Sequence, residues 1–410
     1  MLDIKLLRDS PQVVKDGIAV KGAGPKLVDE FLRLDGEWRT FTANLDEKRA
    51  LQNKLSKERN IEAAKKNKEE IKELESKLAA TEKSREEILL QIPNLPDAAA
   101  PRGKSEAENK VLREVGKKPK FDFTPKDHLE LGEALGIIDF ETASRVSGSG
   151  FYYLKNDGVL LEFALVHYAL DFLRSKGFDL WFTPDLAREK YYLGTGYNPR
   201  GPEAQTYLIE NSDLGLVATS EVTLAGIHAG ESFAAEALPK RYAGYSHCFR
   251  QEAGAYGKYS RGLYRVHQFT KVEMYVFTRP EDSAKMHEEL LALEEELWQG
   301  LKVPYRVVEI CTGDLGAQAS RKFDLEAWMP GRNDWGEITS TSNTTDYQAR
   351  RLNIRYKKGG EKPEFAHTLN GTAIATSRAI IAILENYQRK DGKVDVPKAL
   401  EKYMGKKVIG

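Results

Sequence analysis

Residues 240–272 read KRYAGYSHCFRQEAGAYGKYSRGLYRVHQFTKV, with runs of strand-forming residues at both ends of the stretch. The stretch holds one acidic residue, Glu252, and seven basic residues: Lys240, Arg241, Arg250, Lys258, Arg261, Arg265 and Lys271. Basic side chains on alternate residues of a strand share a face, where they repel one another unless an anion lies between them. Because arginine forks match phosphate and carboxylate oxygens, this stretch favours a phosphate-binding site; the alternative is a solvated basic hairpin.

Similar β-rich runs follow at 305–313 and 337–345, and helical runs are expected at 160–176, 283–301 and 373–388. This mixture lacks the regular alternation of βαβ units, so it predicts an α+β fold with an antiparallel sheet. The sequence has no GxxxxGK[ST] loop and no GxGxxG segment after a strand. It therefore predicts neither a P-loop fold nor a dinucleotide-binding fold.

The overall charge is balanced, with 62 basic and 62 acidic residues among 410. This balance excludes a histone-like polycation and an acidic solvating tail, but not a nucleic-acid partner. The length predicts two or three domains at roughly 150 residues each, and a hydrophobic content of 41% is enough for a core. The charged fraction of 30% exceeds the typical value of about 25%, so the excess must be concentrated somewhere.

The excess lies between residues 46 and 87, where 23 of 42 residues are charged. Apolar residues recur there and just before at steps of three and four, which is typical of a coiled coil: Phe31, Leu34, Trp38, Phe41, Leu45 and Leu55, then Ile71, Leu74, Leu78, Ile88 and Ile92. The simplest interpretation is an antiparallel two-helix arm over about 27–92, with helices of roughly 50 and 40 Å. An ordinary bundle face and a dimerising coil are the alternatives.

The reversal of this arm is predicted at RNIEAAKKNKEE, residues 59–70, which places Lys65, Lys66 and Lys68 near its tip. A long solvated arm with a lysine tip suits a large partner. Prolines at 93, 96 and 101 then interrupt the helix, and the polar stretch that follows has no clear periodicity. The expected organisation is an N-terminal domain at 1–100, a linker at 101–120 and a second domain at 121–410.

Two cysteines, Cys248 and Cys311, provide neither a disulfide framework nor a four-cysteine zinc site, so a reducing compartment is expected. The N-terminus has no apolar signal segment. The longest apolar stretch, 160–173, contains Glu162, His167 and Asp171, so it is too short and too charged to span a bilayer. We expect a cytoplasmic protein with no membrane partner.

Several blocks of the sequence resemble motifs of class II aminoacyl-tRNA synthetases, and their residues are similar to those of the seryl-tRNA synthetase family. CFRQE with RGLYRVHQFTKVE resembles motif 2, LNGTAIATSRAIIAILENYQ resembles motif 3, and GFDLWFTPDL resembles motif 1, with its proline at Pro184. ATSEVTLAG, CTGDLGAQASRKFDLEAWMP and EITSTSNTTDYQARRLNIRY resemble further blocks of this family. The predicted arm resembles its tRNA-binding coiled coil, so the resemblance covers essentially the whole chain in order.

The resemblance implies a two-step ligase that uses ATP and Mg²⁺. Serine and ATP would form seryl-adenylate and pyrophosphate, and serine would then pass to the 3′ end of tRNA(Ser). Charging of tRNA(Sec) would depend on whether the host has that tRNA. The resemblance also implies a homodimer formed through the helix near 160–176 and Pro184, and tRNA contacts at Lys65, Lys66 and Lys68. A zinc-dependent form is not expected without a cysteine cluster.

The resemblance also assigns the ATP site. Arg250 would hold the serine carboxylate and the α-phosphate, Glu252 would contact the adenine amino group, and Phe269 and Arg378 would cover the two faces of the adenine. Arg250, Glu252 and Arg378 are therefore the expected catalytic residues. Glu337 and Ser340 would coordinate Mg²⁺, a cation that prefers oxygen ligands. The remaining ATP contacts would be Gln251, Arg265 (to the γ-phosphate), Val266, Ile338 and Thr339.

For serine, Glu273 would bind the ammonium group, and the small pocket would be framed by Thr219, Ser220, Glu221, Asn370 and Thr372, with Arg250 on the carboxylate. A site that hydrogen-bonds a hydroxyl rejects alanine strongly, because its own polar groups would be left unpaired. Threonine must be excluded by its size.

Some residues depart from the family pattern. Ala373 and Ala375 stand where motif 3 often has glycine, and Thr341 and Thr344 stand where cysteines are common. Two alternatives are open at this point: a paralogue that charges another small amino acid or another acceptor, and a catalytically inactive RNA-binding protein.

Overall fold

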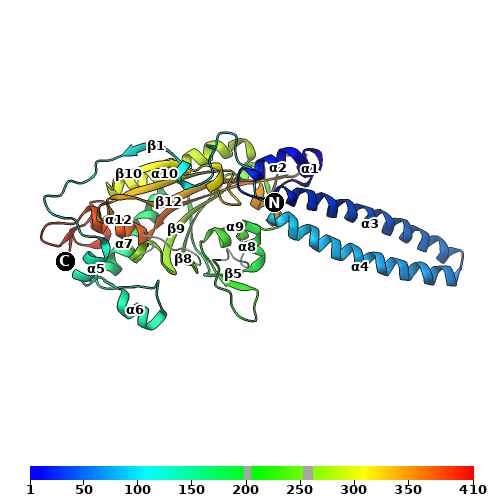
Figure 1. The fold of residues 1–410 in the computed structure, drawn as a ribbon, viewed down its shortest axis with the longest axis horizontal. Helices are drawn as coiled ribbons and strands as arrows, with labels where there is room; N and C mark the ends of the chain where they lie inside the picture. The colour runs from blue at the N-terminus through cyan, green and yellow to red at the C-terminus, as the bar shows by residue number, and fades with distance from the viewer. Residues whose placement is uncertain (198–204, 253–261) are drawn as a thin grey trace. The chain divides into compact units, whose positions relative to one another are not determined.

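The computed structural model describes residues 1–197, 205–252 and 262–410. It divides into two compact units, Met1–Pro96 and Asp97–Gly410, which are described separately (Figure 1). Two residues of the basic stretch, Lys258 and Arg261, lie outside the described residues.

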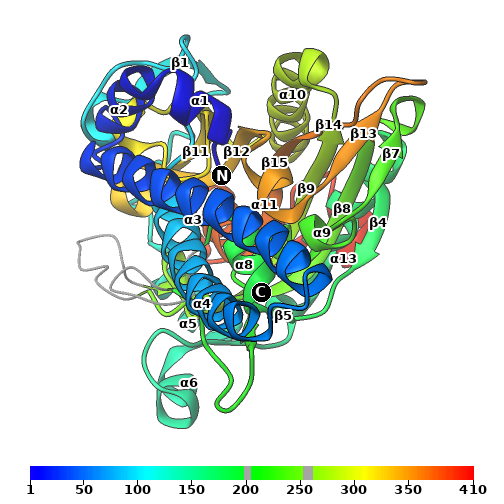
Figure 2. The same ribbon diagram turned by 90° about the vertical axis from the view of Figure 1, so that its right-hand side faces the viewer.

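The first unit is helical, with α1 (Ile4–Asp9), α2 (Pro11–Ala19), α3 (Lys26–Lys57) and α4 (Ile61–Gln91). α3 and α4 have 32 and 31 residues and run antiparallel, side by side (Figures 1 and 2). At ~1.5 Å per residue each is about 47 Å long. The antiparallel two-helix arm is therefore confirmed, and the second helix is longer than expected.

The reversal of the arm is shorter than the sequence suggested. It occupies residues 58–60, and the Asn60 side chain accepts a hydrogen bond from the Ala63 backbone NH at 3.2 Å. An asparagine cap followed by alanines and lysines favours an early helix start. The three lysines predicted at the tip therefore lie in the first turns of α4: Lys65, Lys66 and Lys68.

A buried aspartate ties together the base of the arm. Asp35 is fully buried in α3 and accepts from Arg8 Nε at 2.7 Å and from Arg85 Nε at 2.8 Å. The Arg85 guanidinium lies 4.9 Å from the Trp38 ring centroid and 5.5 Å from that of Phe31. The pKa of Asp35 is lowered, because these arginine contacts outweigh the opposing effect of burial. Three helices are thereby fixed relative to one another.

Farther along the arm, a buried asparagine sets the pairing of the two helices. Asn67 is 3% exposed, and its Nδ2 donates to Lys48 O at 3.0 Å and to Gln52 Oε1 at 2.8 Å. Lys48 also pairs with Glu70 at 2.5 Å. A single polar residue in a coiled-coil seam specifies register at some cost in stability. The seam of the arm therefore includes the polar residues Asn67 and Gln52.

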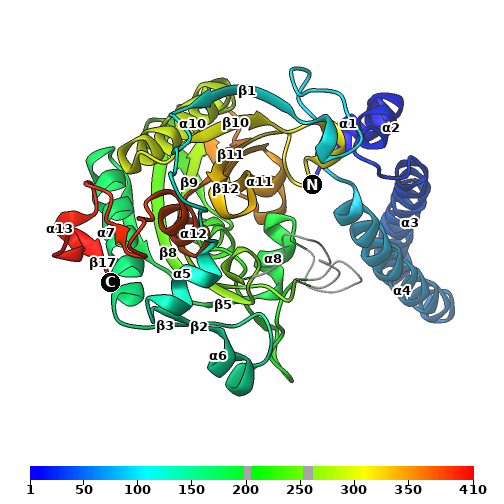
Figure 3. The same cartoon turned by 60° about the vertical axis from the view of Figure 1, so that its left-hand side comes forward.

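The second unit is built on an eight-stranded sheet, ordered β1-β10-β11-β12-β15-β9-β8-β4, which Figure 3 shows from β1 to β8. The strands are β1 (Lys110–Val115), β10 (Tyr305–Glu309), β11 (Arg321–Met329), β12 (Asp334–Thr345), β15 (His367–Ala375), β9 (Gln268–Thr278), β8 (Lys240–Phe249) and β4 (Asp179–Phe182). All neighbours pair antiparallel except β4 and β8. This confirms the predicted α+β class.

Three helices, α7 (Asp157–Ser175), α10 (Ser283–Leu301) and α12 (Thr376–Asn386), share one apolar core with alternate residues of the sheet. The other helices are α5 (His128–Ala134), α6 (Phe140–Ser147), α8 (Glu189–Thr195), α9 (Glu221–Gly226), α11 (Tyr347–Leu352) and α13 (Glu401–Met404). The short strands are β2 (Ile138–Asp139), β3 (Tyr153–Leu154), β5 (Leu186–Arg188), β6 (Leu214–Leu216), β7 (Ser232–Ala234), β13 (Arg355–Lys357), β14 (Glu364–Phe365), β16 (Val394–Asp395) and β17 (Val408–Ile409). Within the described part of the chain, no helix is long and apolar enough to cross a membrane.

The segment 101–120, expected as a linker, is not free of structure. It contains β1, the edge strand that pairs antiparallel with β10. Five of the six β1 residues are exposed and the sixth is partly buried, so the strand carries no alternation of buried and polar side chains. An edge strand without a buried face cannot be distinguished from a loop by its pattern.

Several register shifts interrupt the pairing of the sheet, and two of them lie beside predicted site residues. Leu325 of β11 lies opposite Thr339 of β12, whereas Glu326 lies opposite Glu337, which leaves Ile338 as an extra residue. The pairing of β15 with β9 leaves Ala373 extra in the same way. Residues three apart normally face opposite sides of a sheet, but a bulge shifts this alternation. Glu337 and Ser340 therefore lie opposite Glu326 and Asp324, on one and the same face.

Candidate active site

Arg250 follows directly after β8, and its backbone NH donates to His267 O at 3.0 Å. Its guanidinium carbon lies 5.2 Å from the ring centroid of Phe269, the second residue of β9. The antiparallel pairing of β8 with β9 brings these positions together across the intervening loop. The structure thus combines the predicted carboxylate- and phosphate-binding arginine with the predicted adenine-stacking ring.

The residues next to Arg250 are held by local contacts. Gln251 Nε2 donates to Thr206 O at 3.0 Å. Glu252 adopts a φ of 48°, which is uncommon for a residue other than glycine, and its Oε2 accepts from Arg265 Nη1 at 3.2 Å. Val266 is buried at 3% exposure. These predicted ATP contacts are therefore close neighbours along the ends of β8 and β9.

Arg378, in the first turn of α12, forms an ion pair with Glu337. Its Nη1 lies 2.8 Å from Glu337 Oε1 and donates to Glu337 O at 3.1 Å. The guanidinium carbon is 4.8 Å from the Tyr264 ring centroid. Burial opposes ionisation of Glu337, but the positive charges of Arg378 and Lys322 outweigh it and lower the pKa to about 2. The ion pair with Arg378 therefore favours the charged form of Glu337.

Ser340 lies directly opposite Asp324 of β11, a residue that the sequence did not indicate. Asp324 is 7% exposed, its Oδ2 lies 3.4 Å from Lys322 Nζ, and its Oδ1 has no hydrogen-bond partner among the described residues. Burial, together with the negative charge of Glu337, raises the pKa of Asp324 to about 7. Two carboxylates and a hydroxyl on one face are oxygen donors of the kind that Mg²⁺ prefers.

Two of the predicted ATP contacts, Ile338 and Thr339, have side chains on the opposite side of the sheet. Ile338 is 1% exposed within the apolar core, and Thr339 Oγ1 donates to the buried Glu294 at 2.8 Å. Their contact with ATP stays a prediction. Only their main chain can face a nucleotide, because the bulge turns both side chains into the core.

The predicted ammonium-binding residue, Glu273, is 2% exposed in β9. Its Oε2 lies 2.5 Å from Lys271 Nζ and accepts from Thr372 Oγ1 at 3.2 Å. Thr372 is opposite Glu273 in the β15–β9 pairing. Lys271 was expected only as part of the basic stretch, and its pairing with Glu273 was not predicted.

Glu221 is the centre of a second buried cluster, at the start of α9. It is 2% exposed and accepts from Tyr197 OH at 3.0 Å, from Gln348 Nε2 at 2.7 Å and from Asn370 Nδ2 at 3.1 Å. Burial, reinforced by the negative charge of Glu273, raises its pKa to about 7. The structure therefore brings the predicted Asn370 to Glu221 and adds Tyr197 and Gln348, which the sequence did not indicate.

The other predicted pocket residues are buried beside this cluster. Thr219 and Ser220 are fully buried; Thr219 Oγ1 accepts from Glu221 N at 3.2 Å, and Ser220 Oγ donates to Gly244 O at 3.2 Å. The two threonines that depart from the family pattern join β12 to β15: Thr341 Oγ1 donates to Asn370 O and Thr344 Oγ1 to Thr368 O, both at 2.8 Å.

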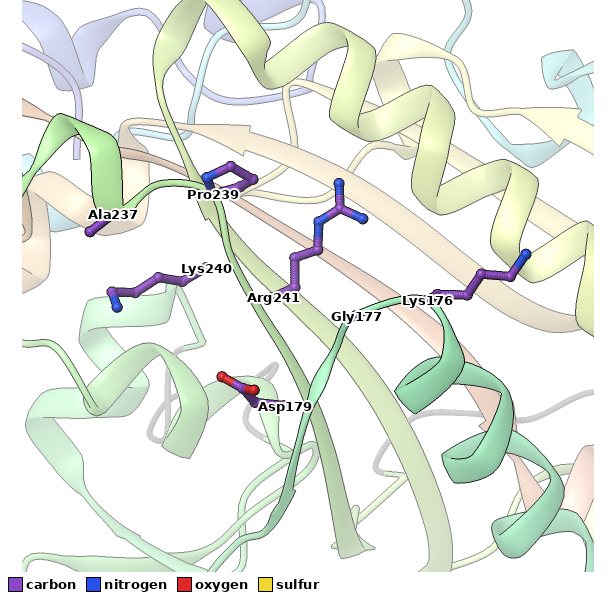
Figure 4. A pocket seen from close by; sticks show the side chains of 7 residues that line it. All are labelled: Lys176, Gly177, Asp179, Ala237, Pro239, Lys240 and Arg241. Atoms are coloured by element: carbon purple, nitrogen blue, oxygen red, sulfur yellow. The ribbon is translucent and has the colours of Figure 1, made fainter.

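Not all of the basic stretch belongs to this site. Lys240 and Arg241 begin β8, at the opposite end from Arg250, and border an open hollow of about 440 Å³ (Figure 4). Arg241 there pairs with Glu289 at 2.5 Å, and the Lys240 ammonium lies 5.3 Å from the Phe233 ring centroid. These two residues, which were not among the predicted ATP contacts, lie apart from Arg250.

The chain is similar to known proteins over its full length. A model described as the tRNA synthetase class II core domain (G, H, P, S and T) matches residues 206–387; the site is thus that of a class II aminoacyl-tRNA synthetase. A second model, the seryl-tRNA synthetase N-terminal domain, matches residues 1–96.

Two curated relatives are each called serine--tRNA ligase. The protein of Rubrobacter xylanophilus is 53% identical, over 100% of this chain and 99% of the relative. That of Dictyoglomus turgidum is 52% identical, over 99% and 98%. Two solved structures are also similar. Seryl-tRNA synthetase from Pyrococcus horikoshii, complexed with ATP, has a TM-score of 0.93 and 43% identity, with 100% and 99% of the two chains covered. Cytoplasmic serine-tRNA ligase from Naegleria fowleri, in complex with AMP, has a TM-score of 0.88 and 37% identity, with 100% and 98% covered.

The chain therefore belongs to the seryl-tRNA synthetase family, and its activity is that of a serine--tRNA ligase.

Proposed function

We propose that this synthetase forms seryl-adenylate on the face shared by β8, β9, β12 and β15, and then transfers serine to the 3′ end of tRNA(Ser). The observation that carries this proposal is the stacking of Arg250 on Phe269 at 5.2 Å, with Glu273 four residues farther along the same strand. ATP and AMP in the related structures support a nucleotide on this face.

In this proposal a carboxylate oxygen of serine attacks the α-phosphorus of ATP, and the bond from that phosphorus to the bridging oxygen of pyrophosphate breaks. Arg250 brings the two anions together and stabilises the charge that develops on the phosphate. Phe269 and Arg378 hold the adenine, Glu252 contacts its amino group, and Arg265 reaches the γ-phosphate. Each of these interactions positions a reactant, which is the main requirement in phosphoryl transfer.

Glu337 and Ser340 are the residues that we propose to hold Mg²⁺. Their oxygens share a face because of the Ile338 bulge, and the carboxylate of Asp324, opposite Ser340, adds a further oxygen donor on that face. No cluster of three or more acidic, histidine or cysteine side chains that could hold a metal occurs among the residues the structure describes. Magnesium sites of this kind take further ligands from substrate phosphates, where the ion neutralises phosphate charge.

Replacement of Glu337 by glutamine tests the cation site. We expect the Mg²⁺ concentration for half-maximal ATP–pyrophosphate exchange to rise about tenfold, because a neutral amide oxygen is a weaker ligand than a carboxylate. Glu309→Gln is a control of the same chemistry, since Glu309 is also paired with an arginine, Arg321, at 2.8 Å. An unchanged Mg²⁺ requirement in Glu337→Gln would exclude Glu337 as a ligand.

The amino-acid substrate is tested by exchange with serine, threonine, alanine and glycine. We expect serine to stimulate exchange about 10⁴-fold better than alanine, because the buried polar groups around Glu221 and Glu273 remain unpaired without the hydroxyl. Stimulation by alanine or glycine instead would indicate a paralogue with another substrate. No exchange with any amino acid would indicate an inactive RNA-binding protein.

We further propose a homodimer that uses α7 and the edge strand β4. Large apolar side chains are exposed on both elements: Leu160 (44%), Phe163 (56%), Leu180 (42%), Trp181 (39%) and Phe182 (72%). β4 ends just before Pro184 and is the last strand of the eight-stranded sheet. An exposed apolar edge of this kind is an association surface.

Phe182→Asp should convert the dimer into a monomer, because an interface cannot bury an unpaired carboxylate without a large penalty. The mass in solution, measured by light scattering after size exclusion, checks this. Ile61→Asp is the control, since Ile61 is 83% exposed on the arm and should leave the mass unchanged. A monomeric wild-type protein would refute the proposed dimer.

The arm is the proposed tRNA-binding part, with Lys65, Lys66 and Lys68 as phosphate contacts. We extend the proposal to tRNA(Sec), which charging of a selenocysteine tRNA transcript would test; no charging would restrict the enzyme to tRNA(Ser).

Cytoplasmic location is also proposed. It is supported by the two buried cysteines, Cys248 and Cys311, which are both free, and fractionation of cells would test it.

A further inference from the structure

Gln348, in the short helix α11, is fully buried and joins four separate segments of the catalytic unit. Its Nε2 donates to Thr195 O at 2.9 Å and to Glu221 Oε1 at 2.7 Å. Its Oε1 accepts from Tyr275 OH at 2.7 Å and from Thr368 Oγ1 at 2.8 Å. These four partners come from α8, α9, β9 and β15.

The orientation of this amide is fixed by its partners. Thr195 O is a backbone carbonyl and can only accept, so the nitrogen of the amide must face it. The two hydroxyls then donate to the amide oxygen. Both protons and both lone pairs of the side chain are used, so a reversed amide would place its oxygen against the carbonyl and against Glu221 Oε1. Gln348 therefore presents its amide nitrogen, and not its amide oxygen, to Glu221.

Glu221 depends on such donors because its surroundings disfavour its charge. Glu273 adds negative charge from β9, and Lys271 of the same strand offsets part of it. Tyr197 and Asn370 supply the other two hydrogen bonds to the carboxylate. Removal of one donor from a buried carboxylate leaves an unsatisfied group at a high energetic cost, so the position of Glu221 is sensitive to Gln348.

We propose that Gln348 is a positioning residue that fixes the Glu221 carboxylate and thereby sets the affinity of the enzyme for serine. This inference rests on the proposed place of Glu221 in the serine pocket. Gln348 itself touches no substrate in this scheme. It acts through Glu221, and its two hydroxyl partners, Tyr275 and Thr368, act through Gln348.

The test is Gln348→Glu, measured by serine-dependent ATP–pyrophosphate exchange. This change keeps the shape and the acceptor for Tyr275 and Thr368, but it places a second carboxylate against Glu221. At pH 8 we expect the KM for serine to rise at least about tenfold, while the KM for ATP changes less than about twofold. At pH 6 the effect should shrink, because two facing carboxylates share a proton and regain a hydrogen bond. The groups that face Glu221 in this titration are Tyr197, Lys271, Glu273 and Asn370.

Gln388→Glu is the matched control. Gln388 is also a buried glutamine, with its Nε2 donating to Lys126 O and Glu385 O, both at 2.9 Å, but it lies after α12. It should lower thermal stability without a selective change in the KM for serine. If Gln348→Glu fails to fold, Tyr275→Phe provides the same test, because it removes only a hydroxyl that orients the amide; about a threefold rise in serine KM is expected.

Equal changes in the KM values for serine and ATP, or a serine KM that is unaffected, would overturn the inference. Glu221→Gln separates this failure from failure of the proposed pocket. If Glu221→Gln alters the serine KM and Gln348→Glu does not, Glu221 keeps its role and Gln348 loses the one proposed. If neither variant alters it, serine does not bind at Glu221.

Discussion

Arg250→Ala should slow serine-dependent ATP–pyrophosphate exchange by about 10²–10³-fold, or ~2.7–4 kcal/mol in the barrier. The physical reason is the proposed role of Arg250, which is to neutralise both reacting anions. Its contact with Phe269 at 5.2 Å also links it to the adenine site, so the KM for ATP should rise as well. Pre-steady-state formation of seryl-adenylate is the direct measurement.

Arg241→Ala is a suitable control for this experiment. Arg241 lies on the same strand as the residues leading to Arg250, but it pairs with Glu289 at the far end of β8. Its loss should leave exchange within about threefold of wild type. An Arg250→Ala enzyme that also stays within a few-fold of wild type would refute the role assigned to Arg250.

Shortening the arm should separate the two steps of the reaction. Lys48 faces Glu70, and Asp35 faces Arg85, so deletion of residues 43–77 with a short glycine linker joins points that face each other. We expect charging of tRNA(Ser) to fall by at least about 10²-fold, since each lost phosphate or backbone contact weakens RNA binding. Serine-dependent exchange should remain within about threefold of wild type.

This deletion keeps the base of the arm intact, including Phe31, Asp35 and Arg85, so the core of the first unit is preserved. Thermal unfolding of the shortened chain serves as the control for folding. Loss of exchange together with charging would show that the arm is needed for adenylate formation. Charging that is retained would show that tRNA binds elsewhere.

Much of the fold can be predicted from local patterns in the sequence. The heptad spacing predicted the arm, and the helix expected at 283–301 coincides with α10. β1 was missed because it is an exposed edge strand without a buried face. The reversal of the arm was predicted to extend too far along the chain. The heptad pattern has no apolar member between Leu55 and Ile71, so it does not show that the second helix already includes Lys65 and Lys66.

Motifs lead to site predictions where they fix the residue type, as at Arg250, Glu273 and Arg378, whose roles stay predictions. The site was not predictable where partners meet only through tertiary packing. Gln348 lies in a recognised block, yet its partners are 20 to 153 residues away in the chain. Asp324 is opposite Ser340 only because of the pairing of β11 with β12. The side chains of Ile338 and Thr339 face the core because of a bulge, which a sequence does not reveal.

The Ile338 bulge determines which mutations the chain can tolerate at this point of β12. The side chain of Ile338 is one apolar group among many in the core, so another aliphatic residue of similar volume fits there. Its removal is a different matter, because the strand would regain regular alternation and turn Glu337 and Ser340 to opposite sides of the sheet. At this point the chain is constrained by the number of residues and not by their identity, so substitutions are tolerated here where insertions and deletions are not.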